Sequence, residues 1–154
     1  MMKFIETSKI YSLNKSTYVN LRWIAYSGQL ITILLVQFFF KYKFDYLLCI
    51  SIIFISILTN LYLSFKIKEI QLNNFLSTIF LAYDIIQLLF LFFLTGGITN
   101  PFIFLIIIPA VFSSQYLNIK SSIILVLITA FGSIFLTFFY QNLPSPNVLH
   151  FHAP

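Results

Sequence analysis

The stretch Thr95-Gly96-Gly97-Ile98-Thr99-Asn100-Pro101-Phe102 is a short, uncharged connector between two long apolar runs of the chain. Its two consecutive glycines can take the left-handed conformation that often follows a helix C-terminus. Asn is a preferred N-cap residue, and Pro suits the first position of a helix. The stretch therefore predicts that one apolar helix ends at Gly96 and that the next begins at Pro101.

The composition of the whole chain agrees with membrane-embedded helices. Of its 154 residues, 60% are hydrophobic and 8% are charged, and the mean hydropathy is +0.96. A soluble domain carries roughly 25% charged residues. The net charge of +5 is confined to short segments between apolar runs, so it indicates membrane topology and not a nucleic-acid partner.

Apolar runs of about 17–25 residues can cross the ~30 Å hydrocarbon core of a bilayer as helices. Short connectors leave no room for a soluble domain between the runs. The predicted fold class is all-α, a polytopic transmembrane helical bundle over residues 21–142. Its five expected spans are about 22–40, 46–65, 75–95, 101–117 and 121–140.

The basic residues predict the orientation of this bundle, because Lys and Arg near helix ends stay preferentially in the cytoplasm. Segment 1–20 is therefore expected in the cytoplasm, and the connector 96–102 is expected on the outer, periplasmic-type face. Arg22, beside Trp23, is interpreted as part of an anchor at the membrane interface. Placing the N-terminus inside leaves Lys41 and Lys43 outside and puts seven basic residues in the cytoplasm: Lys3, Lys9, Lys15, Arg22, Lys66, Lys68 and Lys120.

Five crossings leave the C-terminal tail 143–154 on the outer face. A cytoplasmic output domain would need a sixth helix after Pro154, so the tail is interpreted as a periplasmic-type loop of a truncated chain. The alternative is a five-span protein that ends in a disordered tail. No metal site is predicted, because Cys49 is the only cysteine and because His150 and His152 have no third ligand nearby.

The connector has residues that suit a small flat ligand. The helix before it presents free carbonyls and the helix after it presents free amides. The oxygens of an oxidised quinone can only accept, so they suit these amides and the Asn100 side chain, whereas a quinol hydroxyl can also donate to the carbonyls. Phe102, with Phe92 and Phe93 upstream, offers rings for stacking. Helix capping alone remains the alternative explanation of the motif.

A second candidate is Asp84, which lies in the middle of the apolar run 75–95. An ionised carboxylate there costs ~2.5–3.5 kcal/mol even on the lenient insertion scale. Gln87 shares its helix face. One interpretation is a functional acid in signalling, ~18 Å along the helix from Gly96 at 1.5 Å per residue. The other is a polar clamp to another helix through one of three side chains: Ser56, Thr59 or Asn60.

Together these residues resemble the RegB/PrrB/ActS family of redox-sensing histidine kinases. The segments 21–25 (Leu-Arg-Trp-Ile-Ala) and 28–30 (Gly-Gln-Leu) are similar to the start of the family's first helix. Asp84, Gln87 and Leu88 are similar to its third helix. The segment 96–102 matches the family's Gly-Gly-x-x-Asn-Pro-Phe element in full.

The resemblance implies a six-helix domain of the bacterial inner membrane that senses the ubiquinone pool and regulates an attached, dimeric histidine kinase, which signals to a response regulator. Three parts of such a kinase would lie beyond Pro154: the phosphoacceptor, the ATP-binding domain and the family's redox-active cytoplasmic cysteine. This chain alone is therefore expected to be inactive as a kinase. Cys49 is not expected to act as the redox-active cysteine. The resemblance assigns five residues to the quinone site: Gly96, Gly97, Asn100, Pro101 and Phe102.

Two other functions remain open at this point. Asp84 and Gln87 would suit a small membrane transporter subunit that binds a polar solute. A structural membrane module without a ligand is the third interpretation.

Overall fold

The computed structural model describes residues 13–39 and 41–142, so the predictions for the N-terminal residues 1–12 and for His150 and His152 in the tail lie outside the described residues. Within those ranges the chain is mostly helical, which confirms the predicted all-α bundle. The elements in chain order are β1 (Leu13–Asn14), α1 (Lys15–Phe38), α2 (Tyr46–Lys66), β2 (Gln71–Leu72), α3 (Asn74–Leu94), the 3-10 helices η1 (Gly97–Thr99) and η2 (Ile103–Ile106), α4 (Ile107–Tyr116) and α5 (Ile119–Phe138).

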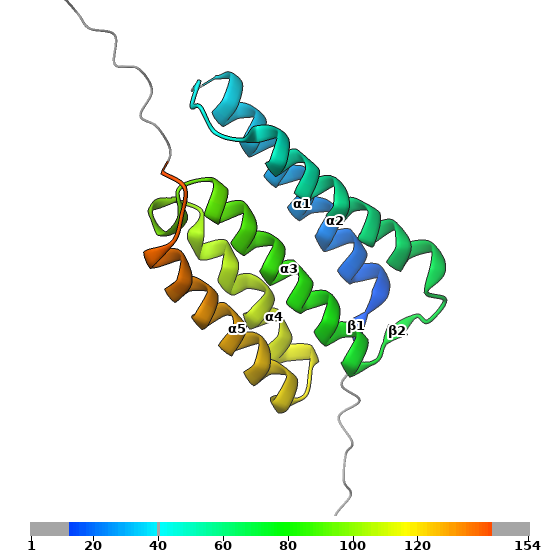
Figure 1. Ribbon diagram of the computed structural model, residues 1–154. Helices are drawn as coiled ribbons and strands as arrows, with labels where there is room; N and C mark the ends of the chain where they lie inside the picture. The colour runs from blue at the N-terminus through cyan, green and yellow to red at the C-terminus, as the bar shows by residue number, and fades with distance from the viewer. Residues whose placement is uncertain (1–12, 40, 143–154) are drawn as a thin grey trace, which may run out of the picture.

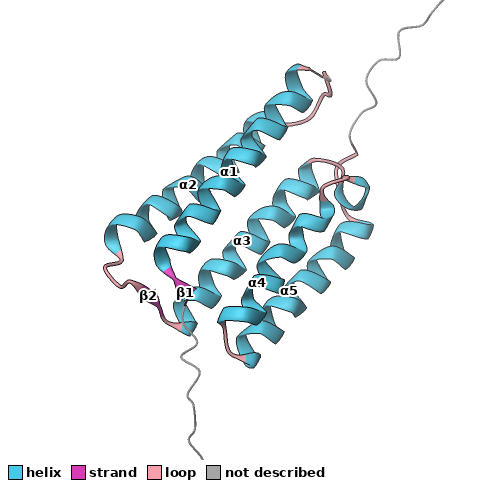
Figure 2. Ribbon diagram, turned by 180° about the vertical axis from the view of Figure 1, so that it is seen from behind, coloured by secondary structure: helices cyan, strands magenta, loops and turns pink. Residues whose placement is uncertain are grey.

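The helices run alongside one another in two groups (Figures 1 and 2). Helices α1 and α2 form a hairpin, and α3, α4 and α5 form a second group in which α3 packs mainly on α5. The α1–α2 loop, the connector 96–102 and the end of α5 lie together at one end of the bundle, here called the connector end. The short β1–β2 pair and the α4–α5 turn lie at the opposite end, here called the strand end.

Asparagine side chains start three of the helices by accepting a backbone N–H of the first turn, as good N-caps do. Because Asn14 caps α1, this helix begins at Lys15 and includes about two more turns than the predicted span 22–40. The three capping bonds run from Thr17, Leu76 and Ser121 to Asn14, Asn73 and Asn118.

The start of α1 is tied to the end of α2 at the strand end. Leu13 of β1 pairs antiparallel with Leu72 of β2. The Lys15 ammonium donates to the backbone carbonyl of Ile67 at 2.7 Å and to that of Ser64 at 3.4 Å. Ser64 lies in the last turn of α2 and Ile67 is its C-cap residue. The lysine therefore stabilises a helix end whose last carbonyls have no intrahelical partner.

Four of the described helices are long and apolar enough to cross a membrane: α1, α2, α3 and α5. The apolar segment Ile103–Tyr116, made of η2 and α4, is shorter. The side chain of Asn100 accepts the N–H of Phe102 at 2.9 Å, as an N-cap would, but the chain continues with i to i+3 bonds. The prediction of a continuous α-helix from Pro101 is therefore wrong, and the α-helical geometry begins at Ile107.

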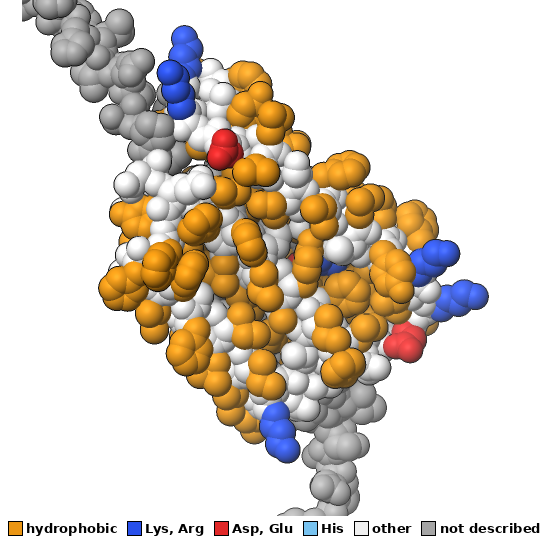
Figure 3. Space-filling model, in the orientation of Figure 1, with side chains coloured by type: hydrophobic (Ala, Val, Ile, Leu, Met, Phe, Trp, Pro, Cys, Tyr) orange, Lys and Arg blue, Asp and Glu red, His pale blue; other side chains and the backbone are white. Residues whose placement is uncertain are grey.

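The flank of the bundle is covered with hydrophobic side chains, and the charged side chains on the visible face gather toward the two ends (Figure 3). Phe54, Phe65, Phe131 and Phe138 are among many large apolar residues that are more than half exposed. Contiguous exposed apolar surface on this scale marks a lipid-facing surface. The protein is a multi-pass membrane protein.

Candidate functional site

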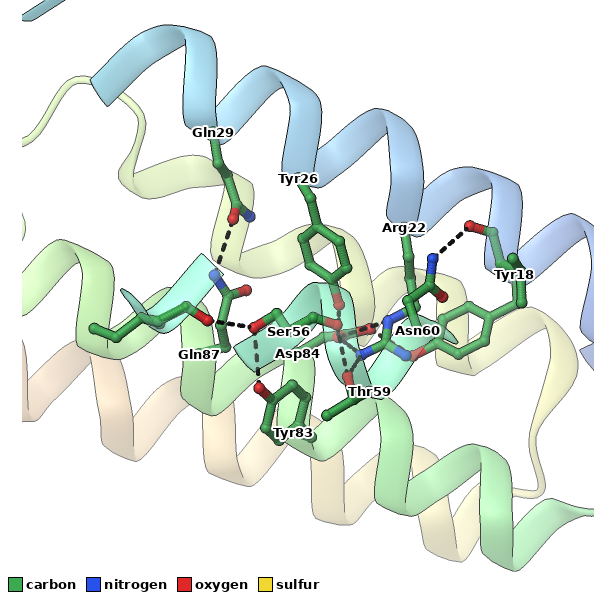
Figure 4. Close-up of polar contacts among 12 residues, drawn as sticks. Tyr18, Arg22, Tyr26, Gln29, Ser56, Thr59, Asn60, Tyr83, Asp84 and Gln87 are labelled. Carbon is green, nitrogen blue, oxygen red and sulfur yellow. Dashed lines mark hydrogen bonds and ion pairs between the residues drawn. The ribbon is translucent and has the colours of Figure 1, made fainter. Parts of the chain in front are cut away.

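A layer of buried and partly buried polar side chains lies between the α1–α2 hairpin and α3 (Figure 4). We call this layer the polar seam. Buried polar groups are costly in an apolar interior unless they are hydrogen-bonded. The seam consists of Tyr18, Arg22, Tyr26 and Gln29 from α1, Ser56, Thr59 and Asn60 from α2, and Tyr83, Asp84 and Gln87 from α3.

The centre of the polar seam is a buried ion pair between Arg22 and Asp84. Oδ1 of Asp84 lies 2.9 Å from Nη2 and 3.1 Å from Nε of the guanidinium. Arg22 is only 3% exposed. The interpretation of Arg22 as an interfacial anchor is therefore wrong: each charge supplies the partner that makes burial of the other tolerable.

Aromatic side chains enclose the ion pair. The hydroxyl of Tyr18 donates to Oδ2 of Asp84 at 2.5 Å, and that of Tyr26 donates to Oδ1 at 3.2 Å. The Arg22 guanidinium carbon also lies 5.4 Å from the ring centroids of both tyrosines, 5.5 Å from that of Phe80 and 5.9 Å from that of Tyr83. Rings at these distances stabilise a cation through their negative faces.

Helix α2 contributes to the polar seam by a hydrogen bond to Arg22, and it makes no hydrogen bond to Asp84. Nη2 of Arg22 donates to the Thr59 hydroxyl at 2.9 Å, and the Asn60 amide donates to the backbone carbonyl of Val19 at 3.2 Å. Ser56 pairs with the Tyr83 hydroxyl at 3.0 Å. The expected clamp therefore exists, but Asp84 bonds to α1 and none of the three α2 side chains reaches it directly.

Gln87 lies one turn from Asp84 and has a separate partner. Its amide donates to Oε1 of Gln29 at 2.9 Å, which adds a second polar link between α3 and α1. The predicted shared helix face is confirmed, because Asp84 and Gln87 both face the hairpin. The two side chains bond to different residues of α1 and not to each other.

The sequence contains a signal for the polar seam within α1. Tyr18, Arg22 and Tyr26 are spaced four residues apart, so they lie on one face of a helix. That spacing becomes informative once α1 begins at Lys15. An expected helix start at residue 22 placed Tyr18 outside the bundle and Arg22 at its edge.

The connector 96–102 folds back tightly on α3 and α5. Gly96 has φ of 101° and Gly97 has φ of 56°, which confirms the expected left-handed turn after α3. A Cβ on Gly97 would lie 2.4 Å from Cβ of Tyr140 and 3.0 Å from the carbonyl oxygen of Leu136. Gly97 is therefore required both by its backbone conformation and by the close approach of the chain that ends α5.

The Asn100 side chain holds the connector in its conformation through hydrogen bonds within the loop. Its amide nitrogen donates to the backbone carbonyl of Thr95 at 3.0 Å and to the Thr95 hydroxyl at 2.9 Å, while its oxygen accepts from Phe102. The amide that the sequence suggested for a quinone is thus engaged in shaping the loop. Phe102 itself is 43% exposed, so its ring is accessible at this end of the bundle.

An apolar groove of about 400 Å³ lies between α3 and α5, next to the connector. Leu136 lines the groove and also lies under Gly97. Leu89 packs so closely on Gly132 that a Cβ there would lie 2.4 Å from Cδ1 of the leucine. Aromatic rings form much of the wall: Phe90, Phe93, Phe131 and Phe135.

With this geometry established, known proteins were compared with the chain. It is 34% identical over 110 residues to the sensor histidine kinase RegB of Cereibacter sphaeroides, a match that covers 71% of this chain. The chain matches the N-terminal portion of the RegB family of sensor histidine kinases. The resemblance to the RegB family is thereby confirmed.

The RegB match covers 24% of the length of that relative, so the chain corresponds to a minor part of a RegB-type protein. No family model matches the chain, and no solved structure matches it. The relationship to RegB therefore concerns the membrane helices described above.

Proposed function

We propose that this chain is the membrane sensor portion of a redox-responsive histidine kinase in the bacterial inner membrane, and that its ligand is ubiquinone or ubiquinol of the membrane pool. The site would be at the connector end, made of the connector 96–102 and the α3–α5 groove. The N-terminus would be cytoplasmic. The kinase core, the second protomer of a homodimer and the response regulator are the partners that a RegB-type protein implies.

The observation that carries this proposal is that Leu136, which lines the groove, is also in contact with the connector through its backbone carbonyl. Leu136 packs under Gly97 and lines the groove, and Phe93 lines the groove while its carbonyl accepts the N–H of Gln141 beyond α5. We expect a quinone ring to stack on the exposed Phe102 and its isoprenoid tail to lie along the apolar, phenylalanine-rich groove.

The five family residues have different roles in this proposal. Gly96 and Gly97 permit the turn, and Asn100 and Pro101 fix the loop that follows it. Phe102 is the member with an accessible side chain, and it is the residue that we expect to stack on a quinone ring.

The charge distribution supports the orientation. Arg22 is buried and does not count as a loop charge. Among the described residues, the strand end then has more basic side chains than the connector end, which favours a cytoplasmic strand end. The strand end has Lys15, Lys66, Lys68 and Lys120, whereas the connector end has Lys41 and Lys43.

Photolabelling with an azido-ubiquinone tests the proposed site. The protein is reconstituted in proteoliposomes, irradiated with the probe, and the labelled peptides are mapped by mass spectrometry. We expect label on the connector and on groove residues such as Phe93 and Phe135, with competition by unmodified ubiquinone. Phe102→Ala should reduce the labelling of this region severalfold.

Phe104→Ala is the matched control, because Phe104 is an exposed phenylalanine of the neighbouring η2. It should label like the wild type. Equal labelling of Phe102→Ala and wild type, or label spread evenly over the lipid-facing side of α1 and α2, would contradict the quinone site.

The geometry gives the alternative transporter function less support. Both oxygens of Asp84 already accept bonds from Arg22, Tyr18 and Tyr26, and Gln87 bonds to Gln29. A polar solute would have to displace these partners. Uptake by vesicles that is abolished in Asp84→Asn would nevertheless establish that function.

A further inference from the structure

Helix α1 has unpaired polar groups on its exposed side, which the other three long helices do not have. Its exposed hydroxyl and amide side chains have no hydrogen-bond partner among residues 13–39 and 41–142: Ser16, Thr17, Asn20 and Ser27. In α2 and α5 the exposed hydroxyls of Ser51 and Thr137 each donate to a carbonyl of their own helix, at 2.8 and 3.1 Å. Helix α3 exposes no serine, threonine, asparagine or glutamine.

Asn20 and Ser27 lie on the side of α1 that points away from the polar seam. Tyr18, Arg22 and Tyr26 of the same helix face α3 through that seam. Each residue turns a helix by about 100°, so Asn20 lies nearly opposite to both Tyr18 and Arg22. The bonds that join α1 to the rest of the bundle are therefore out of reach of these two side chains.

Exposed positions continue along this side of α1 in alternating steps of four and three residues, with the half-buried Leu34 in the series. An average step of about 3.5 residues is the repeat with which two helices pack side by side in a left-handed pair. We call the exposed members of the series the outer face of α1. They are Asn20, Ile24, Ser27, Ile31 and Phe38.

The outer face lies on a helix long enough to cross a membrane. Ser27 is about 18 Å from Lys15 at 1.5 Å per residue, close to the middle of a ~30 Å hydrocarbon core. Hydrocarbon offers no hydrogen bonds, so polar side chains that face it favour contact with another helix. Helix α1 is also the least hydrophobic of the four candidate spans, and none of the others is less buried than it is.

Symmetry indicates which helix satisfies these groups. Two copies inserted in the same direction are related by a two-fold axis along the membrane normal, so identical residues meet at the same depth. An asparagine amide and a serine hydroxyl each contain a donor and an acceptor, so each can bond to its own copy. A charged side chain would repel its copy, and the outer face has none.

We propose that the outer face of α1 packs against the same face of a second copy, as a parallel helix pair in which the two Asn20 amides bond to each other. The Ser27 hydroxyls meet in the same way near the middle of the membrane. The inference rests on the homodimer of the proposed function and supplies its contact surface. It uses none of the residues of the connector or of the α3–α5 groove.

Disulfide cross-linking tests this contact. The exposed residues between 23 and 31 are replaced by cysteine one at a time, in the full chain with Cys49→Ser, and proteoliposomes are oxidised with copper phenanthroline. We expect cross-linked dimer from Ile24→Cys, Ser27→Cys and Ile31→Cys and severalfold less from the positions between them. The reason is that a disulfide requires two Cα atoms within about 7 Å. Ser51→Cys, at an exposed serine of α2, is the matched control and should stay monomeric.

The asparagine is tested by fluorescence energy transfer between labelled copies in proteoliposomes. Asn20→Leu removes both bonds of the symmetric pair, so dimerisation should weaken about tenfold, the effect of two interhelical bonds of average strength. Gln115→Leu is the control, because Gln115 is an exposed amide of α4 without a partner in the described part of the chain. It should dimerise like the wild type, and an equally strong dimer of Asn20→Leu would overturn the proposed amide pair.

The outcomes separate this inference from the proposed function. A dimer that cross-links as well through Ser51→Cys as through Ser27→Cys would overturn the α1 contact and leave the homodimer in place. A protein that stays monomeric at every protein-to-lipid ratio would overturn both. Labelling by azido-ubiquinone is measured independently, so neither result decides the quinone site.

Discussion

The two interfaces of α3 are built on different chemistry. Toward the α1–α2 hairpin, α3 presents the polar seam with the Arg22–Asp84 pair. Toward α5 it presents apolar side chains that pack closely, as at Gly132 and Leu89. Lipid is as apolar as leucine, so in a bilayer the apolar interface is stabilised by close packing. The polar interface is stabilised by hydrogen bonds and an ion pair between side chains that would find no polar partner in lipid.

The comparison indicates a division of roles. The polar seam permits one register of the hairpin on α3, because a shift would leave a buried charge unpaired. The α3–α5 interface is continuous with the connector and contains no described ion pair. We expect the ligand to act on this second interface while the first stays fixed.

The largest effect is expected from breaking the polar seam. Asp84→Leu leaves the Arg22 guanidinium buried without its carboxylate, and removal of one partner of a buried pair costs about 3–5 kcal/mol. The free energy of unfolding, measured by sodium dodecyl sulfate titration in mixed micelles, should fall by that amount. The double variant Arg22→Leu, Asp84→Leu should recover most of the loss. A double variant as unstable as Asp84→Leu would contradict the pairing.

The next effect is expected at the connector. Gly97→Ala places a methyl group against Tyr140 in a left-handed backbone conformation, which should cost about 1–3 kcal/mol in the same titration. Gly28→Ala is the control, because a Cβ on Gly28 meets no atom within 4 Å. Alanine in that helix should be neutral or stabilise by up to about 1 kcal/mol. Equal costs at both glycines would show that the connector is not closely packed.

A smaller effect is expected at the α3–α5 interface. A Cβ on Gly132 would lie 2.4 Å from Cδ1 and 2.6 Å from Cδ2 of Leu89, which are the flexible end of that side chain. Gly132→Ala should therefore cost about 1 kcal/mol, the low end of the range for overpacking. Adding Leu89→Ala makes room for the methyl group, so the two substitutions should be non-additive. Strict additivity would mean that the helices separate at this point.

The smallest effect is expected at the second polar link between α3 and α1, the hydrogen bond of Gln87 to Gln29. Gln87→Leu removes the bond to Gln29 without leaving a charge behind. Polar interhelical bonds in a membrane average about 0.6 kcal/mol in double-mutant cycles. A cycle of Gln87→Leu and Gln29→Leu should give a coupling of that size. A coupling as large as that of the Arg22–Asp84 pair would show that the ion pair is not the dominant contact of the polar seam.

Much of the fold was predictable from local pattern. Four of the five expected spans correspond to long helices, with ends displaced by a few residues except at the start of α1. The left-handed glycines at the connector also followed from sequence, because their conformation is a property of a few neighbouring residues. The 3-10 geometry of η2 did not follow, since the difference between i to i+3 and i to i+4 bonding is small and packing decides it.

The candidate site was predictable in part. Asp84 was recognised because an acid in an apolar run requires a partner. One of its two interpretations is a clamp to side chains of α2, whereas the structure pairs it with Arg22 of α1, 62 residues away in the chain. Asn100 was recognised as a cap residue, but its bonds to Thr95 depend on the three-dimensional course of the connector.

Local sequence was enough to specify a membrane-embedded bundle of apolar helices, a glycine turn after the third span and a buried acid that needs a partner. These features follow from composition, period and local conformational preference, which each segment has on its own. The tertiary structure decided that Arg22 turns inward to Asp84 and that Asn100 closes the connector. It also decided that the end of α5 packs against Gly97. The reason is the same in each case: contacts between residues far apart in sequence exist only once the helices have packed.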